Sequence, residues 1–323
     1  MPPAFYYQCK ETFCFNNNIN AFTGHRHISV DLLPDPAYIN CTRARKDGLM
    51  IIGIDIGGST TDIVGFEGNS ILHPCTVRAD DPVSSAAGAL GRYLTETGHQ
   101  LDDVDTLAVT GVGAGALSDS LLGLSVVKVT EFEAIGGGGV FLTGIESAVV
   151  VSLGTGTAIV TVDNGQMSHW GGTGVGGGTL IGLSKALFGV SNIETIARKA
   201  AAGHLDRVDL SVGDIATRVI PGLPADTTAA NFGKMSDDIT DNDLALAVVN
   251  LVCETVGMIA AGAAGSAGKD TVVLVGKLAS FPVAGEVFRK LSALNGLRYV
   301  VSPQASFATA VGAAVSVWEG KLK

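Results

Sequence analysis

Short apolar runs, bounded by glycine, asparagine and hydroxyl residues, recur along the chain after Met50. Runs of this length that are rich in β-branched residues predict buried strands. The first group lies at residues 51–56, 61–66, 70–77, 106–111 and 125–130. Between these strands the pattern predicts a helix over 83–97. A second helix is expected from Phe132 towards Thr143, although the glycines at 136–139 weaken this prediction.

The same order of elements begins again near residue 148. Strands are predicted at 148–153, 158–162, 166–170, 271–276 and 298–302, and helices at 180–188, 192–203, 244–265, 283–292 and from Thr309. Ser191 and Glu194 have the spacing of a capping box for the second of these helices. Because two strand–turn–strand–turn–strand units each lead into helices, we predict a duplicated α/β fold with a cleft between the halves. The domains are expected at 50–146 and 147–323.

Residues 1–49 differ from the rest of the chain. They contain two of the 43 glycines, four of the 10 prolines and three of the five cysteines, and no helical or strand period persists. We expect no stable packing for this segment. It is interpreted as a disordered tail or as a non-native extension upstream of Met50, and a small accessory element is the remaining alternative.

Composition narrows the class of protein. Hydrophobic residues make up 46% of the chain and charged residues 16%, so a large core can be buried. The net charge of −10 argues against a nucleic-acid partner. No segment is predicted to span a membrane, since the most apolar one, 244–265, contains Asn250 and Glu254. Few, scattered cysteines and no secretory signal predict a cytoplasmic protein.

Two turns of small residues are the candidate binding site. Gly57 and Gly58 follow the first strand, and the turn 154–157 follows the strand that begins the second half. Such turns expose backbone N–H groups and let the main chain approach a ligand closely. Facing each other across a cleft, they would wrap a polyphosphate, and Asp55 could hold a hydrated Mg²⁺ against it. The alternative is that each turn is merely tight.

A glycine cluster at 171–179 formally contains the dinucleotide-binding pattern, with Glu194 as the ribose-binding acid. We reject that interpretation because the cluster follows a hairpin and does not open a βαβ unit. Glycines at the start of the following helix can still bind an anion at the helix N-terminus.

Taken together, these motifs resemble those of the type II pantothenate kinases, a branch of the actin, sugar kinase and Hsp70 ATPase superfamily. The resemblance is carried, in the family's order, by "GIDIGGS", "VTEFEA", "SLGTGT", "GGTGVGGGTLIGL", "TAANFGK", "VVLVG" and "FATAVGAA", and covers nearly everything after Met50. It implies duplicated actin-like (ribonuclease H-like) ATPase domains with a nucleotide cleft between them.

The resemblance also implies ATP- and Mg²⁺-dependent phosphorylation of pantothenate, or of a close analogue, on the route to coenzyme A. Glu131 would be the general base, with Glu133 an equal candidate from the residues alone. A homodimer and feedback by coenzyme A or acyl-CoA are further expectations. The positions expected to bind nucleotide are Asp55, Gly57, Gly58, Ser59, Thr60, Gly154, Thr155, Gly156, Thr157, Gly176, Gly177, Gly178 and Lys277. Those expected to bind the acceptor are His169, Gly171, Gly172, Ala230 and Asn231.

Two positions depart from the family pattern. Asp62 stands where the first phosphate loop usually has a lysine, and an anion there repels a triphosphate. We hypothesise that Lys277 substitutes for the missing cation. His169 stands where the family has an arginine near the acceptor, and a histidine lacks the bidentate, permanently charged fork.

Two rival functions remain open. Similar loops occur in the ATPase activators of radical dehydratases, but those share an iron–sulfur cluster, and Cys75 and Cys253 have no partner in sequence. A degenerate kinase that binds nucleotide or acyl-CoA and regulates a partner is the second rival. The two lost basic residues favour it, and the retained Asp55 and Glu131 oppose it.

Overall fold

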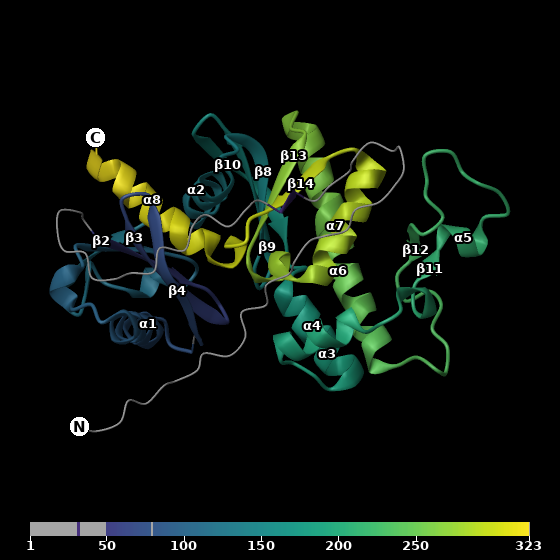
Figure 1. Ribbon diagram of the computed structural model, residues 1–323, viewed down its shortest axis with the longest axis horizontal. Helices are drawn as coiled ribbons and strands as arrows, with labels where there is room; N and C mark the ends of the chain where they lie inside the picture. The colour runs from purple at the N-terminus through teal and green to yellow at the C-terminus, as the bar shows by residue number, and fades with distance from the viewer. Residues whose placement is uncertain (1–30, 33–49, 79, 323) are drawn as a thin grey trace, which may run out of the picture.

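The computed structural model describes residues 31–32, 50–78 and 80–322 (Figure 1). The N-terminal half consists of β2 (Met50–Ile56), β3 (Thr60–Glu67), β4 (Ser70–Arg78), α1 (Pro82–Thr97), β5 (Thr106–Thr110), β6 (Ser120–Leu121), β7 (Leu124–Lys128) and α2 (Glu131–Thr143). The C-terminal half consists of β8 (Ser147–Leu153), β9 (Thr157–Asp163), β10 (Gln166–Thr173), α3 (Gly177–Phe188), α4 (Ile193–Ala201), β11 (Leu210–Ser211), α5 (Val212–Ile215), β12 (Thr228–Ala230), α6 (Asp241–Ala267), β13 (Thr271–Val275), α7 (Pro282–Asn295), β14 (Arg298–Val301) and α8 (Ala308–Leu322).

Each half is built on one six-stranded sheet, and the two sheets share the topology of five strands. The first has the order β4-β3-β2-β5-β7-β6, and the second has the order β10-β9-β8-β13-β14-β1. The sixth strand differs, because β6 pairs antiparallel with β7 whereas β1 pairs parallel with β14. In both, two antiparallel hairpins lead into two parallel strands. Parallel strands at the centre must be covered on both faces, which explains their uninterrupted apolar runs. The predicted duplicated α/β fold is confirmed.

The edge of the second sheet involves the segment for which no packing was expected. Asp31 and Leu32 form β1, which pairs in parallel with β14. The rest of residues 1–49 lie outside the described residues.

Helices α2 and α8 lie between the two sheets and belong to opposite halves of the sequence. The last helix, α8, packs on β2, β3 and β5 of the first sheet, while α2 packs on β8, β9, β10 and β13 of the second. Figure 1 shows α8 in yellow beside the purple and blue strands of the first sheet. The buried cluster around this helix pair contains residues of both sheets. The chain after residue 147 therefore completes the core of the N-terminal half.

Close contact between α2 and α8 explains the glycine run that weakened the helix prediction. A Cβ on Gly138 would lie 1.9 Å from the carbonyl oxygen of Ala308. A Cβ on Gly312 would lie 1.8 Å from the carbonyl oxygen of Ala134. The two helix backbones thus touch where neither carries a side chain, and this contact outweighs the low helix propensity of glycine.

The long helix α6 forms the centre of the second core. It is apolar and long enough to pass a length and hydropathy test for a membrane span, with a window mean hydropathy of 2.0 and 56% of that window buried. Buried core helices pass the same test. Its buried residues pack against β8, β9 and β13 and against α3, α4 and α7, as a buried helix was predicted to do.

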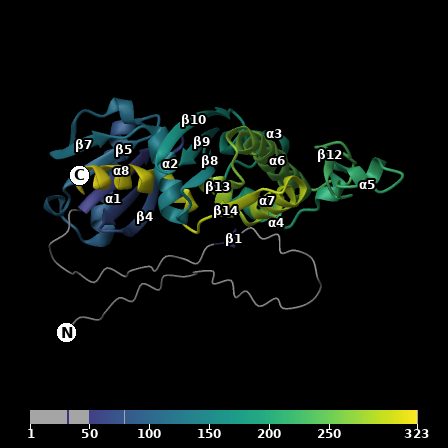
Figure 2. The same ribbon diagram turned by 90° about the horizontal axis from the view of Figure 1, so that it is seen from above.

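Between α4 and α6 the chain forms an arm, β11–α5–β12, that stands away from both sheets (Figures 1 and 2). The predicted cap of α4 is wrong by one residue. Asn192, and not Ser191, is the N-cap, and its side chain accepts a hydrogen bond from the N–H of Thr195. Asparagine competes well with serine at this position.

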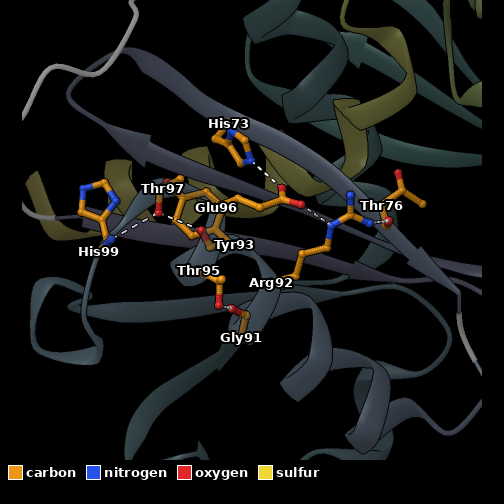
Figure 3. A network of polar contacts seen from close by, with 9 residues as sticks. All are labelled: His73, Thr76, Gly91, Arg92, Tyr93, Thr95, Glu96, Thr97 and His99. Atoms are coloured by element: carbon orange, nitrogen blue, oxygen red, sulfur yellow. Dashed lines mark hydrogen bonds and ion pairs between the residues drawn. The ribbon is translucent and has the colours of Figure 1, made fainter. Parts of the chain in front are cut away.

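A polar network fixes α1 against the edge strand β4 (Figure 3). Glu96 accepts hydrogen bonds from Arg92 Nε at 2.8 Å and pairs with His73 Nε2 at 2.7 Å. Arg92 Nη1 in turn donates to the carbonyl oxygen of Thr76 at 3.0 Å. These hydrogen bonds to charged side chains therefore join α1 to β4, in addition to their apolar packing.

Gly138→Ala should destabilise the protein, because the added methyl group meets backbone and not a side chain that can rotate away. Overpacking of this kind costs about 1–3 kcal/mol. Gly137→Ala is the matched control, since the nearest atom to its Cβ is 3.8 Å away and the change improves helix propensity. Thermal unfolding of both variants tests the contact, and equal melting temperatures would contradict it.

Candidate active site

The first glycine turn joins β2 to β3. Its backbone closes through a hydrogen bond from the N–H of Gly57 to the carbonyl oxygen of Thr60, 3.0 Å away. Asp55 ends β2 just before the turn, directly opposite Asp62 on β3. The turn therefore presents two carboxylates behind a stretch of small residues.

The second turn, residues 154–156, joins β8 to β9 and rests on the start of α3. The N–H groups of Gly177 and Gly178 donate to the carbonyl oxygens of Gly154 and Thr155, both at 2.8 Å. Thr157 Oγ1 donates to the carbonyl oxygen of Val175, also at 2.8 Å. Those two helix N–H groups are consequently occupied, so the glycines at 176–178 shape the second turn and do not offer these donors to an anion.

The two turns meet at one cleft. Ser59 Oγ lies 3.4 Å from Thr155 Oγ1, although the residues are 96 positions apart. The cleft has a cavity volume of about 190 Å³ and opens to solvent. Its walls are formed by Asp55, Gly57, Gly58, Ser59, Thr60, Asp62, Ser152, Leu153, Gly154, Thr155, Gly177, Gly178, Ile181, Ile193, Gly276, Lys277, Leu278, Ser306 and Thr309.

Asp55 has a perturbed carboxyl group. Burial, together with the nearby charges of Asp62 and Glu131, raises its pKa to about 7, although the charge of Lys277 opposes this shift. Gly111, with φ of 88°, lies against this carboxylate, and a Cβ there would be 2.3 Å from Asp55 Oδ1. A buried, poorly compensated carboxylate is where a hard divalent cation gains most from binding.

Lys277 crosses the cleft from the second half. Its Nζ lies 2.9 Å from Asp62 Oδ1 and donates a hydrogen bond to Thr60 Oγ1 at 2.5 Å. The side chain of Lys277 is 37% exposed, and that of Asp62 is 10% exposed. Asp62, the unexpected acid after the first turn, is thus paired with Lys277, the lysine that was expected to supply the missing cation.

The start of α2 distinguishes the two candidate bases. Thr130 caps the helix, and the Glu133 carboxylate accepts from its Oγ1 at 2.7 Å and its N–H at 3.3 Å. Glu133 is thereby committed to the capping box. Glu131 is half-buried, and its charge acts on Asp55. Of the two acids, only Glu131 combines a free carboxylate with a place beside the cleft.

His169 lies beside this helix start. Its ring stacks on Phe132, with ring centroids 3.9 Å apart and an interplanar angle of 15°. His169, Gly171 and Gly172 all lie on β10, which is the edge strand of the second sheet. Of the predicted acceptor residues on this strand, His169 therefore lies beside the start of α2, and none of the three lines the cleft.

Ala230 and Asn231 are not brought to the cleft. They lie at the end of β12 in the arm. Asn231 Nδ2 donates to Asp209 Oδ2 at 3.3 Å and to Glu254 Oε2 at 3.2 Å. The Asn231 amide thus belongs to a polar network under the arm. Neither residue lines the cleft, and their role in binding the acceptor stays a prediction.

Metal ligands are sparse in the described part of the chain. It contains no group of three or more His, Cys, Asp or Glu side chains arranged to hold an ion. Asp55 alone fits a Mg²⁺ that keeps most of its water and shares phosphate oxygens. Cys75 and Cys253 are both buried free thiols, one in β4 and one in α6, which opposes a shared iron–sulfur cluster formed by this pair.

Comparison with known proteins decides the family. A type II pantothenate kinase from Bacillus cereus is 30% identical over 221 residues, which is 64% of this chain and 75% of the relative. The chain belongs to the type II pantothenate kinase family. The Fumble family model matches residues 147–281, the part that contains the second turn and Lys277.

Solved structures agree on the fold of this type II pantothenate kinase family member. The activator of 2-hydroxyisocaproyl-CoA dehydratase from Clostridium difficile, with bound ADPNP, superposes with a TM-score of 0.61 at 17% identity, covering 84% of this chain and 95% of that one. A ROK family glucokinase from Streptomyces griseus, in complex with glucose and AMPPNP, gives 0.55 at 15% identity, covering 83% and 98%. These likenesses place the chain in the actin-like ATPase and sugar kinase fold.

Sequence reasoning missed several residues of this kinase-family cleft. Gly111, which packs against the Asp55 carboxylate, follows β5 and carries no motif. Ser306 and Thr309 line the cleft and lie just before and in the first turn of α8, far from both turns in sequence. Ile181 and Ile193 give the cleft an apolar end. The carboxyl ends of the parallel strands in each sheet were the available signal, since a glycine follows β5 in the first sheet and a serine follows β14 in the second.

Asp55→Asn should stabilise the ligand-free protein at alkaline pH. Below about pH 4 the Asp55 carboxyl is protonated in both states; as pH rises towards 7, only the unfolded carboxyl ionises, so folding stability is lost. The Asp55→Asn variant does not lose this stability, so above pH 7 its free energy of unfolding should exceed that of the wild type by up to about 4 kcal/mol. Urea unfolding from pH 5 to 8 without metal or nucleotide measures it. Asp163→Asn, an exposed acid outside the cleft, is the control; a parallel pH dependence in all three proteins would contradict the prediction.

Proposed function

We propose that this protein transfers the terminal phosphoryl group of ATP to the terminal hydroxyl of pantothenate, the first step towards coenzyme A. The observation that carries the proposal is the meeting of two glycine turns, one from each half, at a cleft that also holds Asp55 and Lys277. Family membership supplies the acceptor, since the relatives are named type II pantothenate kinases.

In this proposal the nucleotide lies along the cleft. The phosphates bind at the turns, where backbone N–H groups and the hydroxyls of Ser59 and Thr155 are available. The adenine end lies towards the apolar side chains Ile181, Ile193 and Leu278. Asp55 would hold Mg²⁺ through water, and the ion, when bound, neutralises phosphate charge.

The acceptor approaches from the side of α2 and β10. Glu131 accepts the proton of the hydroxyl as its oxygen attacks the γ-phosphorus, and the bond to the β-phosphate oxygen breaks to leave ADP. The Phe132–His169 stack and Gly171 and Gly172 form the adjoining wall. Because His169 lacks the arginine fork, this wall holds an acceptor carboxylate less firmly than the family pattern implies.

We also propose that the protein acts in the cytoplasm as a homodimer and responds to coenzyme A or an acyl-CoA. These parts rest on the family resemblance. The apolar side chain of Met258, 48% exposed on α6, is available for contact with a second copy.

Glu131→Gln should reduce the turnover number for pantothenate phosphorylation by about 100- to 10,000-fold, because the hydroxyl loses its proton acceptor. Pantothenate-dependent ADP release from ATP and Mg²⁺ measures it. Glu133→Gln is the matched control, since glutamine preserves the capping box and should keep near wild-type turnover.

The same assay separates the rival function. A wild-type protein that binds Mg·ATP but releases no pantothenate-dependent ADP would support a nucleotide-binding regulator instead. Equal activity of the two glutamine variants would remove Glu131 as the base.

A further inference from the structure

The cleft carries an excess of negative charge before any nucleotide binds. Asp55 and Asp62 line it, and Glu131 lies close enough to act on Asp55. Asp55 and Asp62 are also direct cross-strand partners on β2 and β3, an arrangement in which like charges destabilise a sheet. A triphosphate adds further negative charge, so a cation is needed at this point.

Lys277 is the one basic side chain that lines the cleft among the residues the structure describes. Its ammonium group bonds Thr60 and Asp62, both in the N-terminal half. An ammonium group has three donors. Two are used by these described partners, and the side chain is 37% exposed towards the cleft, so a third donor can reach a phosphate oxygen.

Asp62 is fixed more firmly than Lys277. The residue is only 7% exposed, and Thr76 Oγ1 donates to its Oδ1 at 2.5 Å. The carbonyl oxygen of the same Thr76 accepts from Arg92, which Figure 3 shows at the end of the α1 network. Asp62 therefore gives the lysine a rigid partner tied to β4 and α1.

The backbone of Lys277 is equally constrained. It follows Gly276, whose φ of 92° favours glycine and whose N–H donates to the carbonyl oxygen of Ala305 at 2.8 Å. A Cβ at Gly276 would lie 2.6 Å from the carbonyl oxygen of Leu153, which immediately precedes the second turn. The backbone of Lys277 thus lies beside the second turn, and its ammonium group lies beside the first.

We propose that Asp62 is a positioning residue that holds the Lys277 ammonium group over the cleft, where it contacts the phosphates of ATP. The inference rests on the proposed function and deepens it. The phosphate-binding cation is supplied by the second half of the molecule instead of by the first turn. Because the pair bridges the halves, this contact is complete only when both turns face the same nucleotide.

The dissociation constant of Mg·ATP, measured by titration calorimetry on the full chain, tests the proposal. Lys277→Met should weaken binding by about 10- to 100-fold, the value of a charge-assisted hydrogen bond. Asp62→Asn is the sharper variant, because it removes a negative charge near the phosphates. Simple repulsion predicts tighter binding by this variant, whereas a positioning role predicts weaker binding.

The exchanged pair Asp62→Lys with Lys277→Asp should recover most of the affinity lost by either single change, since it restores the bridge and leaves a cation at the turn. Lys269→Met is the control. It breaks an ion pair of 2.9 Å with Asp163 outside the cleft and should leave Mg·ATP binding unchanged. Thermal unfolding confirms that each variant is folded, and the KM for pantothenate should change little.

Asp62→Asn binding Mg·ATP as tightly as wild type, or more tightly, would overturn the inference, as would unchanged binding by Lys277→Met. Wild-type protein that binds Mg·ATP through this pair but does not phosphorylate pantothenate overturns the proposed function alone. Wild-type protein that does not bind Mg·ATP overturns both.

Discussion

The contact between α2 and α8 is the constraint on which the rest of the structure depends. The two helices come from different halves of the sequence, pack on opposite sheets and touch backbone to backbone at Gly138 and Gly312. A side chain at either of these two glycines would push the helices apart. Because the glycine turns lie at strand ends carried by those sheets, the spacing of the helices also sets the spacing of the turns. Ser59 Oγ and Thr155 Oγ1, one from each turn, lie 3.4 Å apart, and this close approach requires that the two sheets are held rigidly.

The charged residues of the cleft are divided between the two halves of the molecule, so neither half forms the complete site alone. The acids Asp55 and Asp62 are on the first sheet, and the lysine that compensates them lies just after β13 of the second sheet. The raised pKa of Asp55 shows that the compensation is incomplete without a ligand. An electrostatic cost in the ligand-free state is typical of sites that bind a charged ligand, because binding of the ligand removes this cost. A divalent cation shared with phosphate would give this relief at Asp55.

Much of the fold could be predicted because its signals are local. Strand, glycine turn and strand follow one another within about twenty residues in each half, and the repeat of that unit indicated the duplication. The family motifs identified the two turns. What could not be predicted depends on contacts between distant positions. Thr60 and Lys277 are 217 residues apart, and nothing near either residue indicates their bond. The exchange of α2 and α8 between sheets is likewise invisible to periodicity, which reports that a face is buried but not against which partner.

The place of Asn231 and the cap of α4 both depend on contacts that the order of residues does not give. The motif around Ala230 was assigned to the acceptor from its order in the chain, and in the structure the Asn231 amide donates to Asp209 and Glu254 under the arm. At α4, two adjacent residues can both cap, and the geometry of the preceding loop selects Asn192. Order along the chain therefore identifies which family a segment resembles, but tertiary partners decide which site it joins.

The two hairpins also show how a duplicated unit acquires different tasks. In the first, Asp55 faces Asp62 across the strands next to the turn; in the second, the pair at the corresponding place is Ser152 and Ala158. Backbone geometry is retained in both, so each can approach phosphate oxygens. Only the first carries charge next to its turn, and it can do so because the second half of the chain supplies Lys277, directly after β13. Neutral residues in the second hairpin in turn avoid adding a third and fourth carboxylate to an already acidic cleft. Division of binding and charge between the halves thus follows from electrostatics, given a shared fold.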